Sequence, residues 1–250
     1  MHQSTETYLD WFILREIPGL GCRSIKRLIR IFKSPGAVLK AGASALGAVQ
    51  GIGKKQIKAI GRHETVKDAA LSELDRVRQK GYRIRVLTDP GYPELLAVIP
   101  DPPPILTFIG RLNPDLPCIA VVGSRKATQY GLNTAGNLSA RLARSGFQVV
   151  SGMAVGIDAM AHEGALREGK PTLAVLGSGL NRVYPRQNQR LFQRITRYGG
   201  VCSEFRVDEK PTPANFPIRN RIIAGLSCGA LVVEAEKRSG SLITARLSGE

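Results

Sequence analysis

The chain has 250 residues, of which 43% are hydrophobic and 22% charged, a composition typical of a globular protein with a substantial core. The formal net charge is +16, with 17 basic against 10 acidic residues in 1–110 and 19 against 10 in 111–250. This excess favours nucleic acid or another anionic surface as partner. The four cysteines are far apart and form no C-x-x-C motif, which argues against a zinc site and against a disulfide framework. Because the chain has no signal-like N-terminus and no long apolar run, we expect a cytoplasmic protein with no membrane role.

Residues 1–85 are predicted to form a small helical domain. Two of its segments resemble each other, 17–28 and 49–60. Each is a Gly-apolar-Gly turn followed by a basic amphipathic helix, which resembles the helix-hairpin-helix element. The second helix begins with lysines that are candidates for a second DNA contact, namely Lys54, Lys55 and Lys58. The same turn also serves purely to pack two helices together, because glycine supplies its geometry, so both roles stay open.

Residues 86–117 are predicted to be a connecting segment packed on the following domain. Prolines recur throughout this stretch and forbid a long helix. Two short apolar runs, 95–99 and 105–109, are candidates for an edge strand or a packed extended segment. Glycine and serine are too scarce for a flexible linker.

Residues 118–250 repeat one pattern, in which a short apolar run ends at small residues and a helical segment follows. The predicted strands are 119–122, 148–150, 172–176, 201–203 and 231–234, and the predicted helices are 128–145, 156–168, 187–198 and 214–226. This alternation predicts an α/β domain with a mostly parallel, doubly wound sheet. Ligands of such sheets bind at the carboxyl ends of the strands, where helix N-termini favour phosphate.

The turns do not form a dinucleotide-binding fingerprint. The first turn, Gly123-Ser124-Arg125, lacks G-x-G-x-x-G, and no acidic residue follows at the spacing that would hold a ribose. Arg125 is placed where a phosphate would lie, and its planar guanidinium suits that ligand.

A basic stretch without acidic residues lies between Glu168 and Glu204. Its cations are Lys170, Arg182, Arg186, Arg190, Arg194 and Arg197. The last four form an arginine stripe, because their spacing places them on one face of a helix. Like charges repel on such a face, so a polyanion would compensate them. The alternative is an ordinary solvated face neutralised by carboxylates from elsewhere in the fold. Tyr184 and Phe192 flank the stripe and are candidates for base stacking, and a core position for Phe192 is equally compatible.

No catalytic group stands out. Asp158 and His162 have the spacing of a hydrogen-bonded helical pair, while Glu204 and Glu234 end strands and are better placed as acid or base. No nucleophile elbow of the G-x-S-x-G type occurs. Arg219 and Arg221 diverge on a helix, so one could reach the site while the other forms a structural pair.

Five motifs in order resemble the DprA/Smf family of DNA-processing proteins. They are Gly-Ser-Arg at 123–125, the segment 151–166, the segment 174–180 with Tyr-Pro-Arg-Gln-Asn at 184–188, the segment 216–227, and Val-Glu-Ala at 233–235 with Ser-Gly-Ser-Leu-Ile-Thr-Ala at 239–245. The resemblance implies an extended Rossmann-like domain preceded by a small all-α, SAM-like domain. It also implies binding of single-stranded DNA without sequence specificity, protection of that strand, loading of the RecA recombinase in natural transformation, and homodimerisation through the Rossmann-like domain. It implies no catalysis, cofactor or metal.

Carried over by motif, the expected DNA contacts are Gly123, Ser124, Arg125, Lys126, Gly152, Gly177, Ser178, Gly179, Arg186, Asn188, Gln189, Arg190, Phe192, Arg219 and Arg221. The family often has lysine directly after the motif asparagine, whereas this chain has Gln189 followed by Arg190. The chain also ends at Glu250 inside a predicted helix, where the family continues with a further strand and often a winged-helix domain. We therefore expect a truncated form.

Two other readings stay open. Nucleotide phosphoribohydrolases share this Rossmann variant, but their P-G-G-x-G-T-x-x-E signature corresponds here to 233–241, which lacks the glycine pair and the glutamate. The other reading is a scaffold that binds other proteins through its helical region, and no motif in the sequence supports it.

Overall fold

The computed structural model describes residues 5–113 and 116–235, which fall into two compact units. The first unit contains residues 1–89 and 100–105, and the second contains 90–99 and everything from 106 onward. The expected connecting segment, 86–117, is thus divided between the two units. The three-part division at residues 85 and 117 stays a prediction.

The first unit is helical, as expected. Its helices are α1 (Thr5–Glu16), α2 (Cys22–Phe32), α3 (Pro35–Lys40), α4 (Ala43–Gly47), α5 (Lys54–Ile60) and α6 (Glu64–Gln79), and strand β1 (Arg83–Val86) follows them. Apolar side chains of α1 and α2 form its core, since those of Trp11, Phe12, Leu14, Ile25 and Leu28 are at most 1% exposed. The strand β1 modifies the expectation of an all-α domain.

The second unit is built on a mostly parallel sheet. It contributes the strands β2 (Ile105–Gly110), β3 (Cys118–Gly123), β4 (Gln148–Ser151), β5 (Thr172–Val175), β6 (Gly200–Ser203) and β7 (Gly229–Val233). Their order in the sheet is β2-β6-β5-β4-β3-β7. Neighbours from β6 to β7 run parallel, and β2 pairs antiparallel with β6. The expectation of an extended Rossmann-like, mostly parallel sheet is confirmed.

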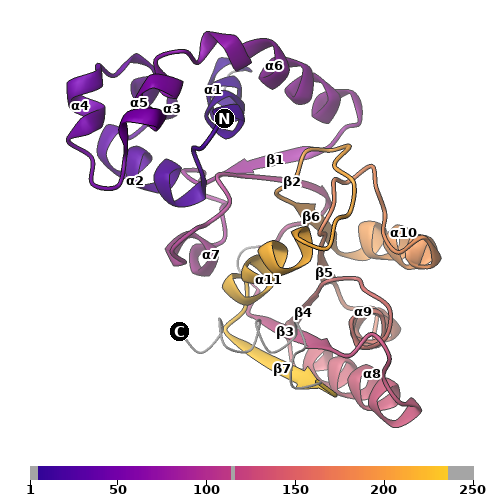
Figure 1. Ribbon diagram of the computed structural model, residues 1–250. Helices are drawn as coiled ribbons and strands as arrows, with labels where there is room; N and C mark the ends of the chain where they lie inside the picture. Colours follow the sequence, from indigo (N-terminus) through magenta and orange to yellow (C-terminus); the bar gives the residue numbers. More distant parts are fainter. Residues whose placement is uncertain (1–4, 114–115, 236–250) are drawn as a thin grey trace. The chain divides into compact units, whose positions relative to one another are not determined.

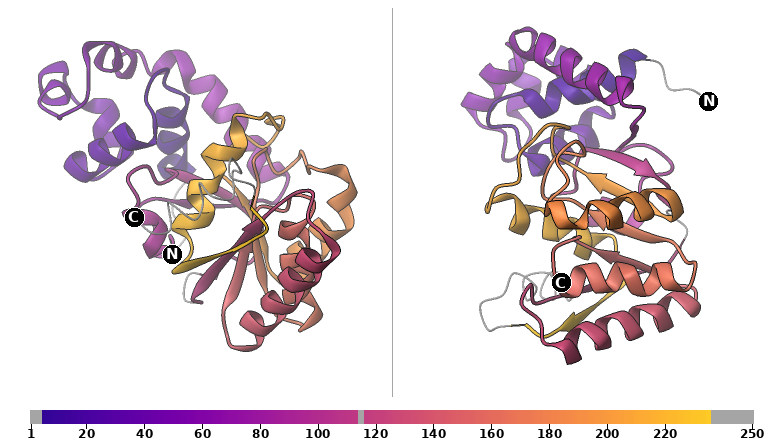
Figure 2. Two further views of the ribbon diagram at one scale, coloured as in Figure 1. Left: turned by 60° about the horizontal axis from the view of Figure 1, so that its bottom comes forward. Right: turned by 90° about the vertical axis from the view of Figure 1, so that its right-hand side faces the viewer.

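Helices cover both faces of this sheet. Helices α8 (Gln129–Arg144), α9 (Ile157–Arg167) and α10 (Gln189–Tyr198) lie along one side of the strands, and α11 (Asn215–Gly225) lies on the other (Figure 1, Figure 2). The strands from β3 to β6 are added one after another on one side of β3. Helix α11 then leads back to β7, which lies on the other side of β3. Buried alanines of α8 and α9 pack on Val121 and Val149, which closes the core against the sheet. The strand order therefore reverses between β3 and β7, the place where sheets of this kind bind ligands.

The predicted elements of 118–235 agree with the structure to within two residues at each end, and the start of α10 is one of the two-residue differences. There the predicted helix begins with a separate 3-10 turn, η1 (Arg186–Asn188), and α10 itself begins at Gln189. The run 105–109 is strand β2, as one alternative had it. The run 95–99 is not a strand but part of helix α7 (Glu94–Val98). Prolines at 93 and 100 leave room for one short helix between them, which the proline density concealed.

Candidate nucleic-acid interface

A buried arginine joins the carboxyl ends of two neighbouring strands. Arg219 of α11 is 3% exposed, and its Nη1 donates to Gly152 O, just after β4, at 2.8 Å and to Val175 O at the end of β5. Its Nε donates to Asn220 Oδ1 at 3.1 Å. Burial lowers the pKa of Arg219 to about 10, and the nearby carboxylate of Asp158 opposes that shift. Arg219 therefore remains a cation at neutral pH, fixed by carbonyl oxygens rather than presented to solvent.

Two glycines fit around this arginine and its aromatic neighbour. A Cβ at Gly152 would come within 2.5 Å of Arg219 Nη2, and a Cβ at Gly177 would come within 2.7 Å of a ring carbon of Phe216. The turns after β4 and β5 thus need glycine for close approach of side chains from α11. The structure gives these glycines a packing role, and their direct contact with DNA stays a prediction.

An aromatic ring supports the exposed arginine of the first turn. The Cζ atom of Arg125 lies 4.7 Å from the ring centroid of Phe216, and Arg219 Cζ lies 6.0 Å from the same centroid. Tyr184 packs on Phe216 at 5.8 Å between centroids and is 45% exposed. Among the described residues, Arg125 donates no hydrogen bond, so the stacked guanidinium keeps its N–H groups for a ligand.

The first turn uses much of its own hydrogen-bonding capacity. Ser124 N donates to Val233 O at 3.4 Å, and Lys126 N donates to Ser124 Oγ at 3.1 Å. The side chains of Arg125 and Lys126 are exposed. The cationic side chains, more than the backbone of 123–126, are therefore what this turn offers to an anion.

The carboxylate of Glu234 occupies the N-terminus of α8, where the sequence predicts that a phosphate binds. Glu234, after β7, accepts from Thr128 N at 2.8 Å and from Thr128 Oγ1, while Gly131 N donates to Thr128 Oγ1 at 3.1 Å. The hydrogen bond from the Thr128 side chain is the main cause that lowers the pKa of Glu234. Glu234 is thus an anionic cap of α8 rather than an acid or base, and it corrects the expectation of a phosphate at this helix end.

The turn after β5, residues 177–179, is closed by a neighbouring loop. Ser178 is 2% exposed and its Oγ donates to Arg182 O at 2.7 Å. Gly179 N donates to Glu209 O at 3.0 Å. Polar groups of this turn, where DNA contacts are expected, are therefore already bonded to the protein's own backbone.

The arginine stripe is only partly free of acidic partners. Arg186, Arg190, Arg194 and Arg197 are all exposed. Arg194 pairs with Glu163 of α9 at 2.7 Å, so for this arginine the structure agrees with the alternative in which a carboxylate from elsewhere in the fold neutralises the charge. Arg186 and Arg190 form no ion pair with an acidic residue in the part of the chain that the structure describes.

Three neighbours of these arginines have different roles. Asn188 Nδ2 donates to Met153 O at 2.9 Å and to Ala154 O at 3.3 Å, and so fixes the start of α10 to the turn after β4. Gln189 is exposed at that start. Phe192 is 9% exposed and packs in the core, so the structure favours the core position over base stacking.

The two arginines of α11 divide as the helical spacing indicated. Arg221 forms a two-pronged pair with Glu204, with Nη1 to Oε1 at 2.8 Å and Nη2 to Oε2 at 2.5 Å. This half-buried pair occupies Glu204, which removes it as an acid or base candidate. Arg219 is the one that reaches the strand ends, as the buried support of the site.

The sequence predicts a hydrogen-bonded pair of Asp158 and His162, but in the structure each residue has a different partner. Thr172 Oγ1 donates to Val149 O at 2.7 Å, so the 2.7 Å contact between His162 Nδ1 and Thr172 Oγ1 requires Nδ1 to carry the proton. Ala154 N donates to Asp158 Oδ2 at 3.4 Å, and burial raises the pKa of this carboxyl while Arg219 opposes the rise. Both residues are structural: Asp158 lies near Arg219, and His162 is bonded to Thr172.

In the first unit, one glutamine ties the two similar turns together. Gln56 Nε2 donates to Gly19 O at 2.9 Å and to Ser24 Oγ at 3.1 Å, while its Oε1 accepts from Gly53 N at 2.9 Å. The exposed side chains on this helix are Lys54, Lys55 and Lys58. The turns thus pack together, and contact of the lysines with DNA stays a prediction.

Sequence reasoning missed Phe216 as a site residue, because only the fold brings it against Arg125. The last family motif, 239–245, and most of the segment compared with phosphoribohydrolases lie outside the described residues. In the described ranges, no helix has the length and apolarity to cross a membrane, and no group of three or more potential metal ligands occurs.

Comparison with known proteins agrees with this arrangement. The family model described as DNA recombination-mediator protein A matches residues 83–250. Protein Smf from Synechocystis sp. is 42% identical over 256 residues, covering 100% of this chain and 63% of the relative. The DNA processing protein DprA of Streptococcus pneumoniae is 42% identical over 184 residues, covering 73% of this chain and 64% of the relative. This chain therefore spans under two thirds of the length of these relatives.

Solved structures give the same result. The crystal structure of DprA from Streptococcus pneumoniae superposes with a TM-score of 0.83 at 32% identity, covering 100% of this chain and 84% of that one. A second structure, of DprA from Helicobacter pylori, has a TM-score of 0.60 at 32% identity and covers 66% of this chain and 76% of that one. Its description concerns the single-stranded DNA binding mode of that protein.

The buried histidine makes stability depend on pH. Burial first, and the charge of Arg219 second, lower the pKa of His162 from 6.5 to about 3. The unfolded chain therefore binds a proton that the folded chain excludes, and the free energy of unfolding falls as pH drops from 6.5 towards 3, by up to about 1.4 kcal/mol per pH unit. His162→Asn keeps a donor at the Nδ1 position and should flatten this dependence. Denaturant unfolding of both proteins between pH 7 and pH 5 measures it, and parallel profiles would contradict the assignment.

Proposed function

The chain belongs to the DNA recombination-mediator protein A family, the DprA/Smf proteins, and on this premise we propose that it binds single-stranded DNA without sequence specificity. The observation that carries the proposal is the exposed guanidinium of Arg125, held on Phe216 at the carboxyl end of β3. Lys126, next to it in the chain, is also exposed, as are Arg186 and Arg190, which follow Tyr184 in the segment that packs on Phe216. A relative of known structure that is described by its single-stranded DNA binding mode supports the choice of polymer.

We assign phosphate binding to side chains rather than to backbone turns. The helix end at Thr128 carries Glu234, and the loop at 177–179 is closed. Arg125 then supplies a planar fork for one phosphate, and Arg190 supplies the charge that the family places after the motif asparagine. The exposed ring of Tyr184, packed on Phe216, is the stacking platform for a base.

The wider role follows from the family. We propose that the chain acts as a binding protein rather than an enzyme, that it protects incoming single strands in the cytoplasm, and that it loads RecA on them during natural transformation. Two copies would associate through the Rossmann-like unit, and Lys54, Lys55 and Lys58 of the first unit would form a second DNA contact. The description of the family as a recombination mediator supports the loading role, and four free cysteines suit a reducing compartment.

The direct test is a fluorescence-anisotropy titration with single- and double-stranded DNA of equal length at several salt concentrations. We expect tighter binding of the single strand and a steep loss of affinity as salt rises, because phosphate contacts release counterions. A flat salt response would contradict binding through phosphates. Equal affinity for both forms would contradict the preference for single strands.

Removal of Arg125 should weaken binding to all sequences alike. Loss of its charged hydrogen bonds should lower the affinity of Arg125→Ala for single strands roughly tenfold or more. Arg125→Lys should recover only part of the loss, because lysine keeps the charge but not the planar fork. The measurement uses homopolymers and mixed sequences, since phosphate contacts carry no base code. Unchanged affinity of Arg125→Ala would remove this residue from the site.

Two arginines of α10 form a matched pair for testing the stripe. Arg190→Gln should lower the slope of log affinity against log salt by about 0.7, the value for one lost phosphate contact on a single strand. Arg194→Gln removes a charge of the same kind on the same helix, but Glu163 already neutralises it, so the slope should stay near that of the wild type. Equal slopes for the two variants would contradict the assignment of Arg190.

A further inference from the structure

Cys118 and Cys228 are far apart in the sequence but lie next to each other on the neighbouring strands β3 and β7. Strands β3 and β7 pair in parallel with Ile119 opposite Gly229, so one residue earlier Cys118 lies opposite Cys228. The ladder continues to this pair, because Cys228 N donates to Cys118 O at 2.9 Å. Neighbouring strands lie about 4.8 Å apart, within the Cα separations that a disulfide spans, and paired residues project to the same face.

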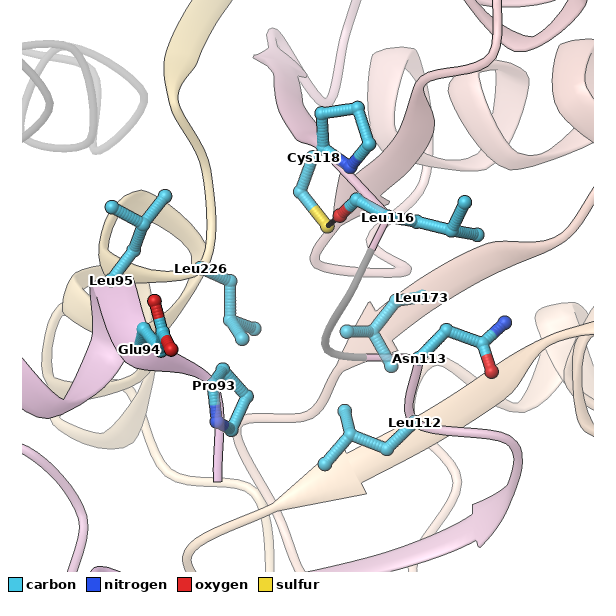
Figure 3. Close-up of a pocket in the computed structure, with 10 residues that line it drawn as sticks. Pro93, Glu94, Leu95, Leu112, Asn113, Leu116, Cys118, Leu173 and Leu226 are labelled. Atoms are coloured by element: carbon cyan, nitrogen blue, oxygen red, sulfur yellow. Dashed lines mark hydrogen bonds between the residues drawn. The ribbon is translucent and has the colours of Figure 1, made fainter. Parts of the chain in front are cut away.

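The two thiols differ in accessibility. Cys228 is exposed, and its Sγ donates to Cys118 O at 3.2 Å, which holds it over the neighbouring strand. Cys118 is 6% exposed, and its sulfur points into a pocket of about 230 Å³ (Figure 3). The wall of this pocket is mostly apolar, with Leu116, Leu173 and Leu226 among its residues.

A buried amide accompanies the inner thiol. Cys118 Sγ donates to Leu116 O at 3.3 Å and to Gln148 Oε1 at 3.6 Å. The amide nitrogen of Gln148 is buried and has no hydrogen-bond partner among the described residues. A half-turn of this amide would offer its N–H to the sulfur when the sulfur is an anion. Burial raises the pKa of Cys118 to about 12, so the exposed Cys228 is the thiol that meets an oxidant first.

We propose that Cys118 and Cys228 form a reversible cross-strand disulfide when the protein meets a hydroperoxide. The Cys228 thiolate attacks one peroxide oxygen, the O–O bond breaks, and the departing hydroxide takes a proton to leave as water. The resulting sulfenic acid is attacked by the sulfur of Cys118. The S–S bond forms as the S–O bond breaks, and the proton of Cys118 leaves with the hydroxide as a second water. One hydrogen peroxide is reduced and two thiols are oxidised, and a dithiol reductant reverses the link.

The test treats the folded full chain with hydrogen peroxide and counts free thiols. We expect the count to fall from four to two and to return to four with dithiothreitol. A tryptic map without reduction should join peptide 112–125, which contains Cys118, to peptide 222–237, which contains Cys228. Cys22→Ser and Cys202→Ser are the matched controls and should still form this link.

Single variants separate the two roles. In Cys118→Ser, the sulfenic acid at Cys228 should persist and be trapped by dimedone, whereas in Cys228→Ser the thiol of Cys118 should stay reduced. Cys118→Ala replaces the serine variant if the latter fails to fold. A thiol count that remains at four, further oxidation of Cys228 without a joined peptide, or a Cys228–Cys228 link between two copies would overturn the proposal.

Discussion

The buried guanidinium of Arg219 is the interaction on which the rest of the site depends. It donates hydrogen bonds to carbonyl oxygens at the ends of β4 and β5 and lies near Asp158. Its position also leaves no room for a side chain larger than glycine in the turn after β4. A buried cation is costly unless its hydrogen bonds and counter-charge are in place, so these groups are fixed together. Removing one partner would leave an uncompensated charge under the strand ends. The scaffold is thus electrostatic as well as apolar.

This scaffold determines which groups can meet a ligand. Phe216 lies on the same helix as Arg219, and its ring contacts both Arg125 and Tyr184. The protein's own atoms satisfy two other anion-binding positions at the strand ends, through Glu234 at α8 and through the loop that covers 177–179. What stays available is a set of exposed cationic side chains and an aromatic ring. Such a surface suits a flexible polyanion better than a small nucleotide held by backbone amides.

The sequence predicted the strands and helices of 118–235 well, because short apolar runs that end in small residues are local signals with a fixed period. The roles of single charges were less predictable, because they depend on partners far along the chain. Arg194 is neutralised by a carboxylate 31 residues away, and Thr128 is capped by one 106 residues away. Charge counting within one segment therefore overstated how many arginines are free. The pairing of Arg221 with Glu204 was foreseeable only as one of two alternatives, since helical spacing shows that two side chains diverge and not where each goes.

The central claim is that Phe216 positions Arg125 for phosphate, and a double-mutant cycle on single-strand affinity tests it most directly. The cycle compares Arg125→Ala, Phe216→Leu and the double variant at one salt concentration, with each protein checked for folding by denaturant unfolding. If the ring acts through the arginine, the two losses overlap, and the double variant binds about as weakly as Arg125→Ala alone. Losses that simply add would show that the two residues act independently and would contradict the account.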